Sequence, residues 1–382
     1  MTQQLSTRLG DVCTFRKGKK PSITFDEQVA GSQPYLLIES FDGTRENFTN
    51  DLSCVLCSED DTLIVCDGAR SGLTSFGHRG YVGSTIAALV PDKGKIFPGF
   101  LYHFVNSRYE FLNKSVHGAA VPHIERQLLL GLRFHLPPLT EQERIVRILN
   151  EAEEMKRLRA QANNRTTDFI PALFDEMFGD PVKNEKRWTL KSVGELLTLC
   201  EYGTSEKADD DSTGIPMLRM GNVSVTGELI LNDLKYIKLN ESDKKKYLLQ
   251  KGDILFNRTN SRELVGKTGM WDGRFDAVAA SYFIRLRFDE QLESPLHFTV
   301  FMNLALMKQR LMSMARGAVG QANINAKELQ SIMVPVPPIE LQNEFAARVE
   351  EIRILELDQF VGEQKVESLF QSLLHRAFEG EL

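Results

Sequence analysis

Two long segments of the chain carry apolar residues at intervals of three or four positions. The first stripe occupies positions 145, 148, 152, 155, 158, 162, 169 and 173, and the second occupies 345, 349, 352, 355, 366, 369, 373 and 377. This spacing predicts an amphipathic helix over 140–178 and another after residue 339. Pro171 lies within the first segment and should bend or interrupt that helix, because proline lacks the backbone N–H.

Each predicted helix has one apolar seam, and an isolated helix of this kind needs a packing partner. The long seams favour an antiparallel pair packed as a coiled coil, in which the first helix would be a rod of roughly 58 Å at about 1.5 Å per residue. The alternative is that each helix lies against its own globular part. Gln359 and Gly362 weaken the second seam, so the second helix is expected to be bent or looser.

The segments before each helix contain short apolar runs bounded by glycine, aspartate and serine, a pattern typical of β-strands. We therefore expect two mixed α/β domains that are mostly β. The clearest strand candidates are Thr62–Cys66, Thr85–Val90, Asp253–Phe256 and Tyr282–Leu286, and the helix candidates are Phe97–Asn113 and Ser294–Ala315.

The two halves of the chain repeat one another. Pro137-Pro138-Leu139, followed by Gln142, recurs 200 residues later as Pro337-Pro338-Ile339 with Gln342. The repeat predicts an α+β fold with two similar, mostly β domains, each followed by one helix of the favoured antiparallel, coiled-coil-like pair. The expected segments are 1–135 and 187–335 for the two domains, 136–186 for the central helix and linker, and 336–382 for the C-terminal helix.

Composition places the chain among soluble globular proteins, with 42% apolar and 26% charged residues over 382 positions. No apolar run approaches the roughly 18 residues of a membrane-spanning helix, and the start lacks the layout of a secretory signal. The five cysteines argue against a disulfide framework, so a cytoplasmic location is expected. The net charge of −6 arises in 336–382, which holds 4 basic and 10 acidic side chains, whereas the two domains are nearly balanced.

The sequence lacks the common catalytic motifs, so no catalytic residue is predicted. It contains no Gly-x-Gly-x-x-Gly dinucleotide loop, no Asn-Pro-Pro-aromatic methyltransferase motif, and neither His-Glu-x-x-His nor Gly-x-Ser-x-Gly. Gly266-Lys267-Thr268 lacks the first glycine of a phosphate-binding loop. Cys54, Cys57, Cys66 and His78 would suit zinc, but the second half has no matching ligands. Buried thiols are the better interpretation, and no metal is predicted.

Polar loops rich in glycine, arginine, asparagine, serine and threonine follow the predicted strands in both halves. Arginine reads guanine, and asparagine or glutamine reads adenine, through the base edges, while glycine lets backbone amides approach phosphate. Any single basic cluster is explained by a solvated surface, but the recurrence in both halves favours DNA binding. The candidate DNA-binding residues are Arg16, Lys19, Lys20, Arg70, Ser71, Arg79, His117, His123, Tyr202, Thr204, Arg219, Asn222, Asn257, Arg258, Asn260, Arg262, Lys267, Arg316, Gln321 and Asn323.

An ordered set of motifs resembles one protein family. It consists of Leu136–Ile145 and Val336–Gln342, each opening a long helix, the junction Phe174–Pro181, and Gly252–Ser261 with Val265–Thr268. On these motifs, and along essentially its whole length, the chain resembles the specificity subunit of type I restriction–modification enzymes.

The resemblance implies a non-catalytic subunit with two target-recognition domains, each reading one half of a split site in double-stranded DNA. It implies that the two long helices hold these domains apart and dock two methyltransferase subunits, and that restriction subunits complete the complex. No directly bound cofactor is expected, because S-adenosylmethionine, ATP and Mg²⁺ would act in the partner subunits. The helix residues assigned to the spacer and to docking are Gln142, Ile145, Leu149, Met155, Gln342, Phe345, Val349 and Leu355.

The two copies differ in the polar loop that follows one of the predicted strands. The first has Asp67-Gly68-Ala69-Arg70 where the second has Asn257-Arg258-Thr259-Asn260. The two half-sites should therefore differ, and Arg70 is expected to take the role of Arg258.

Three other interpretations stay open at this point. The chain would also suit DNA recognition in a stand-alone methyltransferase or another phage-defence complex. It would alternatively be a nuclease or methyltransferase in its own right, which the missing motifs disfavour. A coiled-coil scaffold without DNA contact is the third interpretation, and it predicts no salt-dependent DNA binding.

Overall fold

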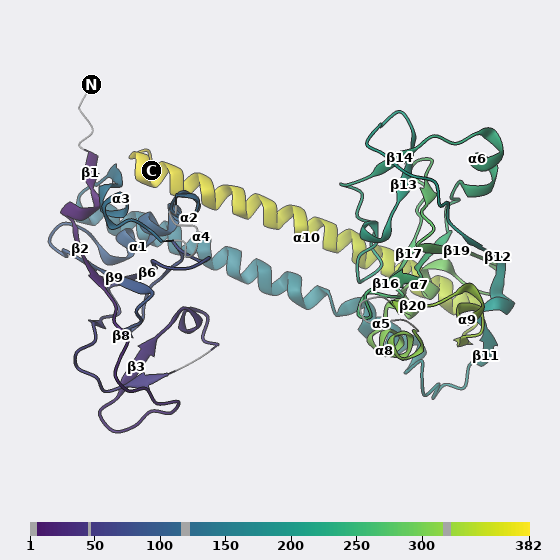
Figure 1. Ribbon diagram of the computed structural model, residues 1–382, viewed down its shortest axis with the longest axis horizontal. Coiled ribbons are helices and arrows are strands. Elements are labelled where there is room, and N and C mark those ends of the chain that lie inside the picture. Colours follow the sequence, from purple (N-terminus) through teal and green to yellow (C-terminus); the bar gives the residue numbers. More distant parts are fainter. Residues whose placement is uncertain (1–5, 45–46, 116–122, 316–321) are drawn as a thin grey trace. The chain divides into compact units, whose positions relative to one another are not determined.

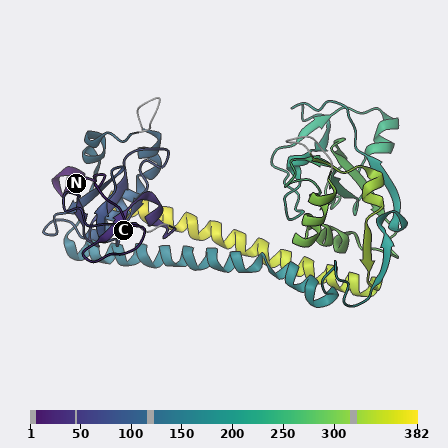
Figure 2. The ribbon, with the colours of Figure 1, turned by 60° about the horizontal axis from the view of Figure 1, so that its bottom comes forward.

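The computed structural model describes residues 6–44, 47–115, 123–315 and 322–382. It divides into two compact units, unit 1 with Met1–Gln161 and Phe360–Leu382, and unit 2 with Ala162–Gln359. Each unit combines one of the two mostly β segments with part of both long helices (Figures 1 and 2). The boundary between the units therefore falls inside the helices.

Unit 1 contains two four-stranded sheets, covered by short helices. One sheet is antiparallel, in the order β2-β9-β6-β7, and the other, in the order β4-β3-β8-β5, includes the parallel pair β3 and β8. The elements are β1 (Ser6–Arg8), η1 (Leu9–Asp11), β2 (Cys13–Lys17), β3 (Gln33–Leu36), η2 (Ile38–Phe41), β4 (Phe48–Thr49), β5 (Leu56–Cys57), β6 (Thr62–Val65), β7 (Thr74–Ser75), β8 (Gly80–Val82), β9 (Ile86–Pro91), α1 (Pro98–Ser107), α2 (Tyr109–Lys114), α3 (Arg126–Gly131) and β10 (Arg133–His135), which pairs with β1.

Unit 2 repeats the first sheet of unit 1 in the order β12-β19-β15-β17. Its second sheet has the order β14-β13-β18, and two short pairs, β11 with β21 and β16 with β20, complete the strands described. The elements are β11 (Thr189–Ser192), η3 (Val193–Leu196), β12 (Leu197–Tyr202), β13 (Ile215–Leu218), η4 (Met220–Asn222), β14 (Lys235–Ile237), α6 (Glu241–Tyr247), β15 (Ile254–Asn257), β16 (Thr259–Asn260), β17 (Thr268–Met270), β18 (Val278–Ala279), β19 (Phe283–Phe288), α7 (Pro295–Asn303), α8 (Ala305–Met314), β20 (Ala322–Asn323), α9 (Ala326–Gln330) and β21 (Met333–Val336).

The predicted strands and short helices are confirmed. The four apolar runs form β6, β9, β15 and β19, the inner strands of the repeated sheets. Each helix candidate forms two helices, α1 with α2 and α7 with α8, because the chain breaks at Arg108 and Leu304.

Three helices account for the long amphipathic segments: α4 (Leu139–Thr166), α5 (Phe169–Phe178) and α10 (Ile339–Glu379). The predicted interruption is confirmed, and it falls at Thr167 and Asp168. Pro171 lies in the first turn of α5, where its missing N–H costs no helical hydrogen bond. None of the helices in the described ranges is both long and apolar enough to cross a membrane.

The second long helix is continuous through the two positions expected to weaken it. Residues Gln359 and Gly362 both lie within α10. The guanidinium of Arg159 packs against Gly362, where a Cβ atom would lie only 1.9 Å from Arg159 Nη2. The missing side chain of Gly362 therefore makes room for Arg159 on the neighbouring helix.

The long helices run antiparallel to each other within each unit, as predicted. In unit 1, Lys156 Nζ lies 2.6 Å from a carboxylate oxygen of Glu367 and 4.4 Å from the centre of the Phe370 ring. In unit 2, Thr166 Oγ1 donates to Gln359 Oε1 at 3.1 Å. Within unit 1 the contacts Lys156–Glu367 and Arg159–Gly362 run in opposite directions along α4 and α10. Within unit 2 the contacts Thr166–Gln359 and Phe174–Phe345 show the same direction for α4 and α5 against α10.

Each helix also packs against the sheet domain of its unit. In unit 1 the ring of Phe378 lies 5.2 Å from Phe100 and 5.3 Å from Phe104, which are buried on α1. In unit 2 the rings of Phe174 and Phe345 lie 5.6 Å apart within the core that contains α7. The two packing arrangements considered from the sequence therefore both occur.

A buried glutamine fixes the start of each long helix. Gln142 donates to the Pro137 carbonyl at 2.7 Å and accepts from the Phe97 backbone amide at 2.7 Å. Gln342 donates to the Pro337 carbonyl at 2.9 Å and accepts from the Ser294 amide at 2.8 Å. The same bonds recur because the two copies share one local structure. Both glutamines are fully buried, so they tie helix to domain.

Candidate nucleic-acid interface

Four polar residues lie near the ends of β12 and β15 in unit 2. The guanidinium carbon of Arg258 lies 4.8 Å from the centre of the Tyr202 ring, and Arg258 Nη1 makes a long hydrogen bond of 3.5 Å to the Ser281 carbonyl. Asn260 lies on β16 and Asn323 on its partner β20, where Asn323 is opposite Thr259 and accepts a hydrogen bond of 3.4 Å from Thr259 Oγ1. We call Tyr202, Arg258, Asn260 and Asn323 the unit 2 cluster.

The unit 2 cluster retains unused hydrogen-bonding capacity. In the cluster, Arg258 Nε is buried and has no hydrogen-bond partner within the described part of the chain. The same holds for the side-chain amide of the neighbouring Asn257, which lies outside the cluster. A guanidinium stacked on an aromatic ring keeps its N–H edge available for a planar acceptor such as a guanine edge. Arg258 is therefore held in a geometry that suits base reading.

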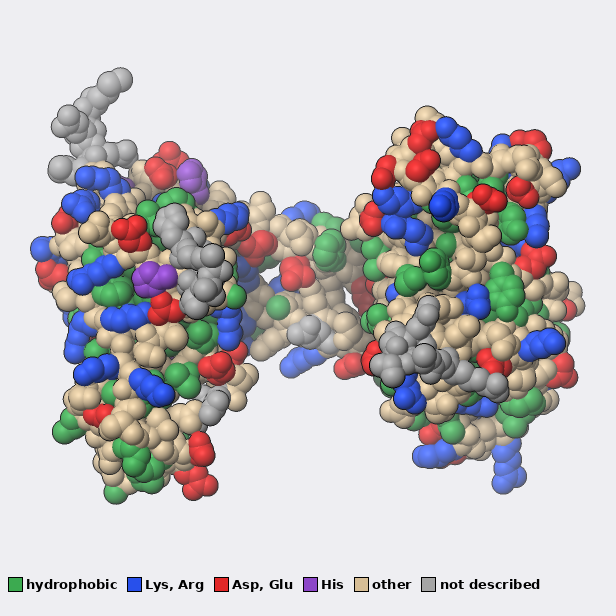
Figure 3. Space-filling view, viewed as in Figure 1, with side chains coloured by type: hydrophobic (Ala, Val, Ile, Leu, Met, Phe, Trp, Pro, Cys, Tyr) green, Lys and Arg blue, Asp and Glu red, His purple; other side chains and the backbone are tan. Residues whose placement is uncertain are grey.

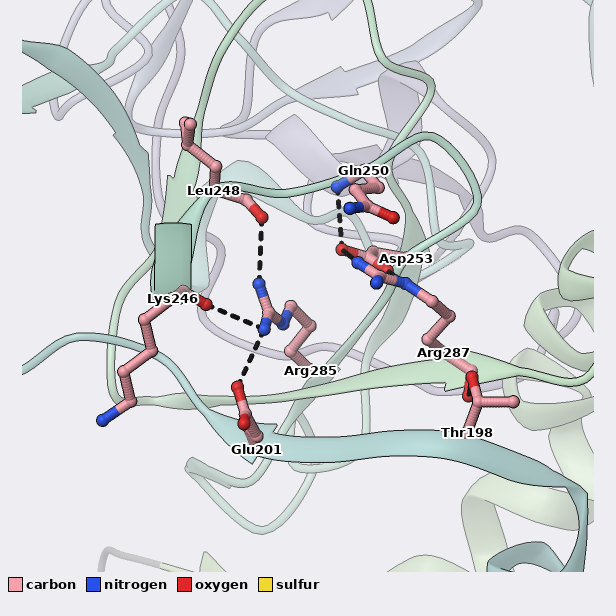
Figure 4. A network of polar contacts seen from close by, with 8 residues as sticks. All are labelled: Thr198, Glu201, Lys246, Leu248, Gln250, Asp253, Arg285 and Arg287. Atoms are coloured by element: carbon pink, nitrogen blue, oxygen red, sulfur yellow. Dashed lines mark hydrogen bonds and ion pairs between the residues drawn. The ribbon is translucent and has the colours of Figure 1, made fainter. Parts of the chain in front are cut away.

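An arginine network holds the neighbouring strands in place (Figure 4). Arg285, which is almost fully buried on β19, donates to the Glu201 carboxylate at 2.8 Å and to the carbonyls of Leu248 and Lys246. Arg287 makes two hydrogen bonds to the Asp253 carboxylate, at 2.7 and 2.9 Å. The network holds β12, β19 and β15 together. Tyr202 is the last residue of β12, and Arg258 directly follows β15.

Several predicted DNA-binding residues are buried and bonded within their own unit. Lys267 Nζ donates to the carbonyls of Met220 and Val223 at 2.7 and 2.6 Å, and burial lowers its pKa. Asn222 donates to two backbone carbonyls and accepts from the Arg219 amide. Ser71, Thr204 and Asn257 are also buried. These side chains shape the loops and lie out of direct reach of DNA in this structure.

Other predicted residues are exposed. In unit 1, Arg16, Lys19, Lys20, Arg79 and His123 are exposed, as is Arg262 in unit 2. Arg219 is partly exposed and pairs with Asp233 at 2.9 Å, whereas Arg70 lies 4.0 Å from Glu39. His117, Arg316 and Gln321 lie outside the described residues.

Charge on the visible surface is mixed on both units. Figure 3 shows Lys and Arg side chains interspersed with Asp and Glu on each of them. This agrees with the near balance of the two domains in the sequence. Selective binding would then depend on the arrangement of a few basic groups, because the net charge of either domain is small.

The residues assigned to the helices divide into two sets. Ile145, Leu149, Phe345 and Val349 are buried in the cores of their units, whereas Met155 is 47% exposed and Leu355 is 57% exposed. Further exposed apolar residues on α10, which were not predicted from the sequence, are Ile354, Leu357, Phe360 and Val361. The sequence could have revealed them, because they lie beside the apolar seam, where a soluble helix normally carries polar residues.

The cysteines are free thiols, as predicted. Cys13, Cys54, Cys57 and Cys66 are buried, and burial raises the pKa of the Cys57 thiol to about 11. Cys57 donates to the His78 backbone carbonyl at 3.6 Å. Among the described residues no group of three histidine, cysteine, aspartate or glutamate side chains is placed to hold a metal ion.

Known proteins match the chain along most of its length. The family model of the type I restriction modification DNA specificity domain matches twice, over residues 6–165 and 185–358. The type I restriction enzyme MjaVIII specificity subunit of Methanocaldococcus jannaschii is 24% identical, with 98% of this chain and 92% of that protein aligned. The type I restriction enzyme EcoKI specificity subunit of Escherichia coli K12 is 27% identical over 85% of this chain and 75% of that protein.

Two solved structures share the fold. A chain from a study of complex assembly and conformational transition of the type I R-M system aligns with a TM-score of 0.65 at 20% identity, covering 99% of this chain and 98% of that one. The type I restriction–modification S subunit from M. genitalium aligns with a TM-score of 0.59 at 13% identity, covering 99% and 97%. Since the two family matches together span most of the sequence, the chain belongs to the type I restriction–modification DNA specificity family, as a non-catalytic specificity subunit that recognises DNA sequence.

Proposed function

We propose that this specificity subunit reads a bipartite DNA target, with one half-site contacted by unit 1 and the other by unit 2. The proposal assigns residues 1–135 and 187–335 to the two recognition domains, and 136–186 and 336–382 to the helices that set their spacing. Its main support is the unit 2 cluster, in which Arg258 stacks on Tyr202, and Asn260 and Asn323 lie on the paired strands β16 and β20 that follow Arg258 and precede α9. Arginine and asparagine side chains held by strands are suited to base edges in the major groove.

The exposed basic residues of both domains would contact the DNA backbone. We assign this role to Arg16, Lys19, Lys20, Arg79 and Arg262, because phosphate contacts fix register without reading sequence. Arg70 and Arg219 would join them if DNA displaced their carboxylate partners, Glu39 and Asp233. Binding should weaken as salt rises, which the scaffold interpretation does not predict.

The exposed apolar side chains of the helices would dock the methyltransferase subunits. Ile354, Leu355 and Leu357 are each more than half exposed on α10 of unit 2, and Met155 and Leu158 are about half exposed on α4 of unit 1. Exposed apolar side chains gathered within one turn of a helix, as Ile354, Leu355 and Leu357 are, indicate an interaction surface. Restriction subunits would join the same complex, and we propose that it acts in the cytoplasm.

Selection from random DNA tests the DNA-reading proposal. The full chain, assembled with its methyltransferase subunits, is incubated with a random duplex pool, and the bound fraction is sequenced. We expect two short specific segments separated by a fixed unspecific gap. A single continuous motif would contradict the proposal that each unit reads its own half-site. The absence of any enriched motif would contradict sequence recognition.

Co-purification tests the docking proposal. Leu355→Glu places a charge on the exposed face of α10 and should reduce recovery of the methyltransferase subunit about tenfold. Ile23→Glu is the matched control, because Ile23 is a similarly exposed apolar residue away from the helices. Equal recovery with both variants would remove α10 from the docking surface.

A further inference from the structure

We infer that unit 1 reads its half-site through a cluster of Lys17, Asp67 and His123, in which the Asp67 carboxylate accepts a hydrogen bond from the exocyclic amino group of cytosine or adenine. This inference rests on the proposed bipartite reading of DNA. It names the residues and the base chemistry of one half-site, and it replaces the expectation that Arg70 takes the role of Arg258.

Equivalent hydrogen bonds show which residues correspond at the ends of β6 in unit 1 and β15 in unit 2. The Ile124 amide donates to the Cys66 carbonyl at 2.9 Å, and the Ile324 amide donates to the Arg258 carbonyl at 2.9 Å. On the other side of the strand, Gly72 donates to Val65 and Gly266 donates to Asn257, both at 2.8 Å. Cys66 therefore occupies the position of Arg258, four residues before Arg70.

The next residues along the chain correspond in the same way. Asp67 forms a β-bridge with His123, and Thr259 pairs with Asn323. Asp67 and His123 thus occupy the positions of Thr259 and Asn323. Asn323 is a member of the unit 2 cluster, so His123 lies at the place where unit 2 presents a base-reading side chain.

Strand register adds the third member of the cluster. Lys17 is opposite Ala87, which is opposite Ile64. In unit 2, Tyr202 is opposite Ile284, which is opposite Phe256. Because Ile64 and Phe256 both stand two residues before the aligned pair Cys66 and Arg258, Lys17 occupies the position of Tyr202.

The three side chains of unit 1 form a bonded array. Lys17 Nζ lies 2.6 Å from Asp67 Oδ2, and His123 Nδ1 lies 2.5 Å from Asp67 Oδ1. All three remain accessible, with 35% of the Lys17 side chain, 26% of Asp67 and 55% of His123 exposed. Burial alone would raise the pKa of Asp67, but the hydrogen bonds and charges of Lys17 and His123 together outweigh it and lower the pKa, so the carboxylate is charged at neutral pH.

The array offers a pattern of donors and acceptors that differs from the unit 2 cluster. Each carboxylate oxygen of Asp67 has a second lone pair after its bond to Lys17 or His123. Because Nδ1 of His123 bonds to the carboxylate, Nε2, which has no hydrogen-bond partner among the described residues, is the nitrogen that would face a ligand. Asp accepts from the cytosine amino group, whereas Arg donates to guanine. The two half-sites would therefore differ in the bases they contain.

Selection with paired variants tests the inference. The full chain, in complex with its methyltransferase subunits, carries Asp67→Asn, which keeps the shape but removes the charge and adds a donor. We expect preference for cytosine or adenine to fall about tenfold at one or two positions of a single half-site. His123→Asn, which introduces the unit 2 residue, should change preference in the same half, and Arg258→Ala should change only the other half.

Asp60→Asn is the matched control, because Asp60 forms an exposed ion pair with Lys93 in the same unit. If Asp67→Asn and His123→Asn both keep the wild-type preferences, the inference fails while the bipartite proposal stands. An equal loss of affinity for all sequences would also overturn it, because the cluster would then only anchor the chain. If the wild-type complex enriches no motif, the proposed function itself fails.

Discussion

At the end of β15, adjacent residues differ in burial, and we expect them to differ in function for that reason. Asn257 is fully buried, whereas Arg258 is partly exposed and stacked on Tyr202. The same separation applies to Lys267, whose ammonium bonds to two carbonyls, and to Arg262, which is exposed. Substitutions at these positions should therefore have different consequences.

Arg258→Ala should weaken binding to the cognate site by about 1–3 kcal/mol and leave binding to random DNA almost unchanged. Alanine removes the guanidinium that would read a base, while the phosphate contacts remain. Titration of both duplexes at one salt concentration measures the difference. Arg274→Ala, which breaks an exposed pair with Asp272 in the same unit, is the control. Equal losses on both duplexes would show that Arg258 contacts only the backbone.

Lys308 should make the free energy of unfolding depend on pH in the alkaline range. Its ammonium donates to the Gly266 carbonyl at 2.8 Å, and burial, with a smaller contribution from Lys267, lowers its pKa from 10.5 to about 7. Between these two pH values the unfolded chain binds a proton that the folded chain has released, so the free energy of unfolding rises with pH.

Urea denaturation of the wild type and of Lys308→Met at pH 7, 8.5 and 9.5 checks this prediction. Methionine keeps the length of the side chain without a titrating group. The wild-type free energy of unfolding should increase relative to that of the variant across the series. A constant difference would mean that Lys308 has its ordinary pKa in the folded protein.

At the scale of elements, each end of α10 belongs to the core of a different unit. Phe378 inserts between Phe100 and Phe104 in unit 1, and Phe345 packs against Phe174 and Phe178 in unit 2. The helix is therefore held by tertiary packing at both ends, and its stability should depend on these rings.

Phe378→Ala should destabilise unit 1 by about 3–5 kcal/mol, because it removes a buried ring and leaves a cavity. Hydrogen exchange of the full chain localises the effect, and faster exchange is expected in α1 and in the last turns of α10. Leu369→Ala, at a half-exposed position on the same helix, should change stability by less than about 0.5 kcal/mol. Similar effects of the two substitutions would place Phe378 outside the core.

The regular elements were predictable because their patterns are local. The helical stripes and the apolar runs of β6, β9, β15 and β19 follow from residue spacing alone. The second sheet of each unit was not predicted, since its strands are two to four residues long and one pair in each is parallel. Such short strands acquire their structure from distant partners and leave little trace in the local pattern.

The candidate site was only partly predictable from the sequence, because some of its members are recognised only from the pairing of distant segments. Arg258, Tyr202 and Asn323 were identified from residue type, but Lys17 and Asp67 were not. The offset between the copies is 185 at Lys17 and Tyr202, 192 at Cys66 and Arg258, and 200 at Ile124 and Ile324. Loops of unequal length change the offset, so sequence comparison matched Arg70 with Arg258, whereas hydrogen-bond register matches Cys66.

At the scale of the whole molecule, the two units share a plan and differ in what they present. Both have the same order of strands in the first sheet and the same glutamine bonds at the helix start. At the end of that sheet, unit 1 presents Lys17, Asp67 and His123 and unit 2 presents the unit 2 cluster. A duplicated frame with different side chains suits an asymmetric, two-part DNA target.

The dependence of affinity on the gap between the half-sites shows whether the helices hold two reading units at a fixed spacing. Duplexes that carry both selected half-sites, with the gap lengthened or shortened one base pair at a time, are titrated with the complex. Each added base pair turns one half-site by about 35° around the DNA axis, given about 10.5 base pairs per turn. We expect one optimal gap and a loss of at least about tenfold when it changes by two base pairs. Affinity that stays the same over several gap lengths would contradict two reading units set at a fixed spacing by the helices.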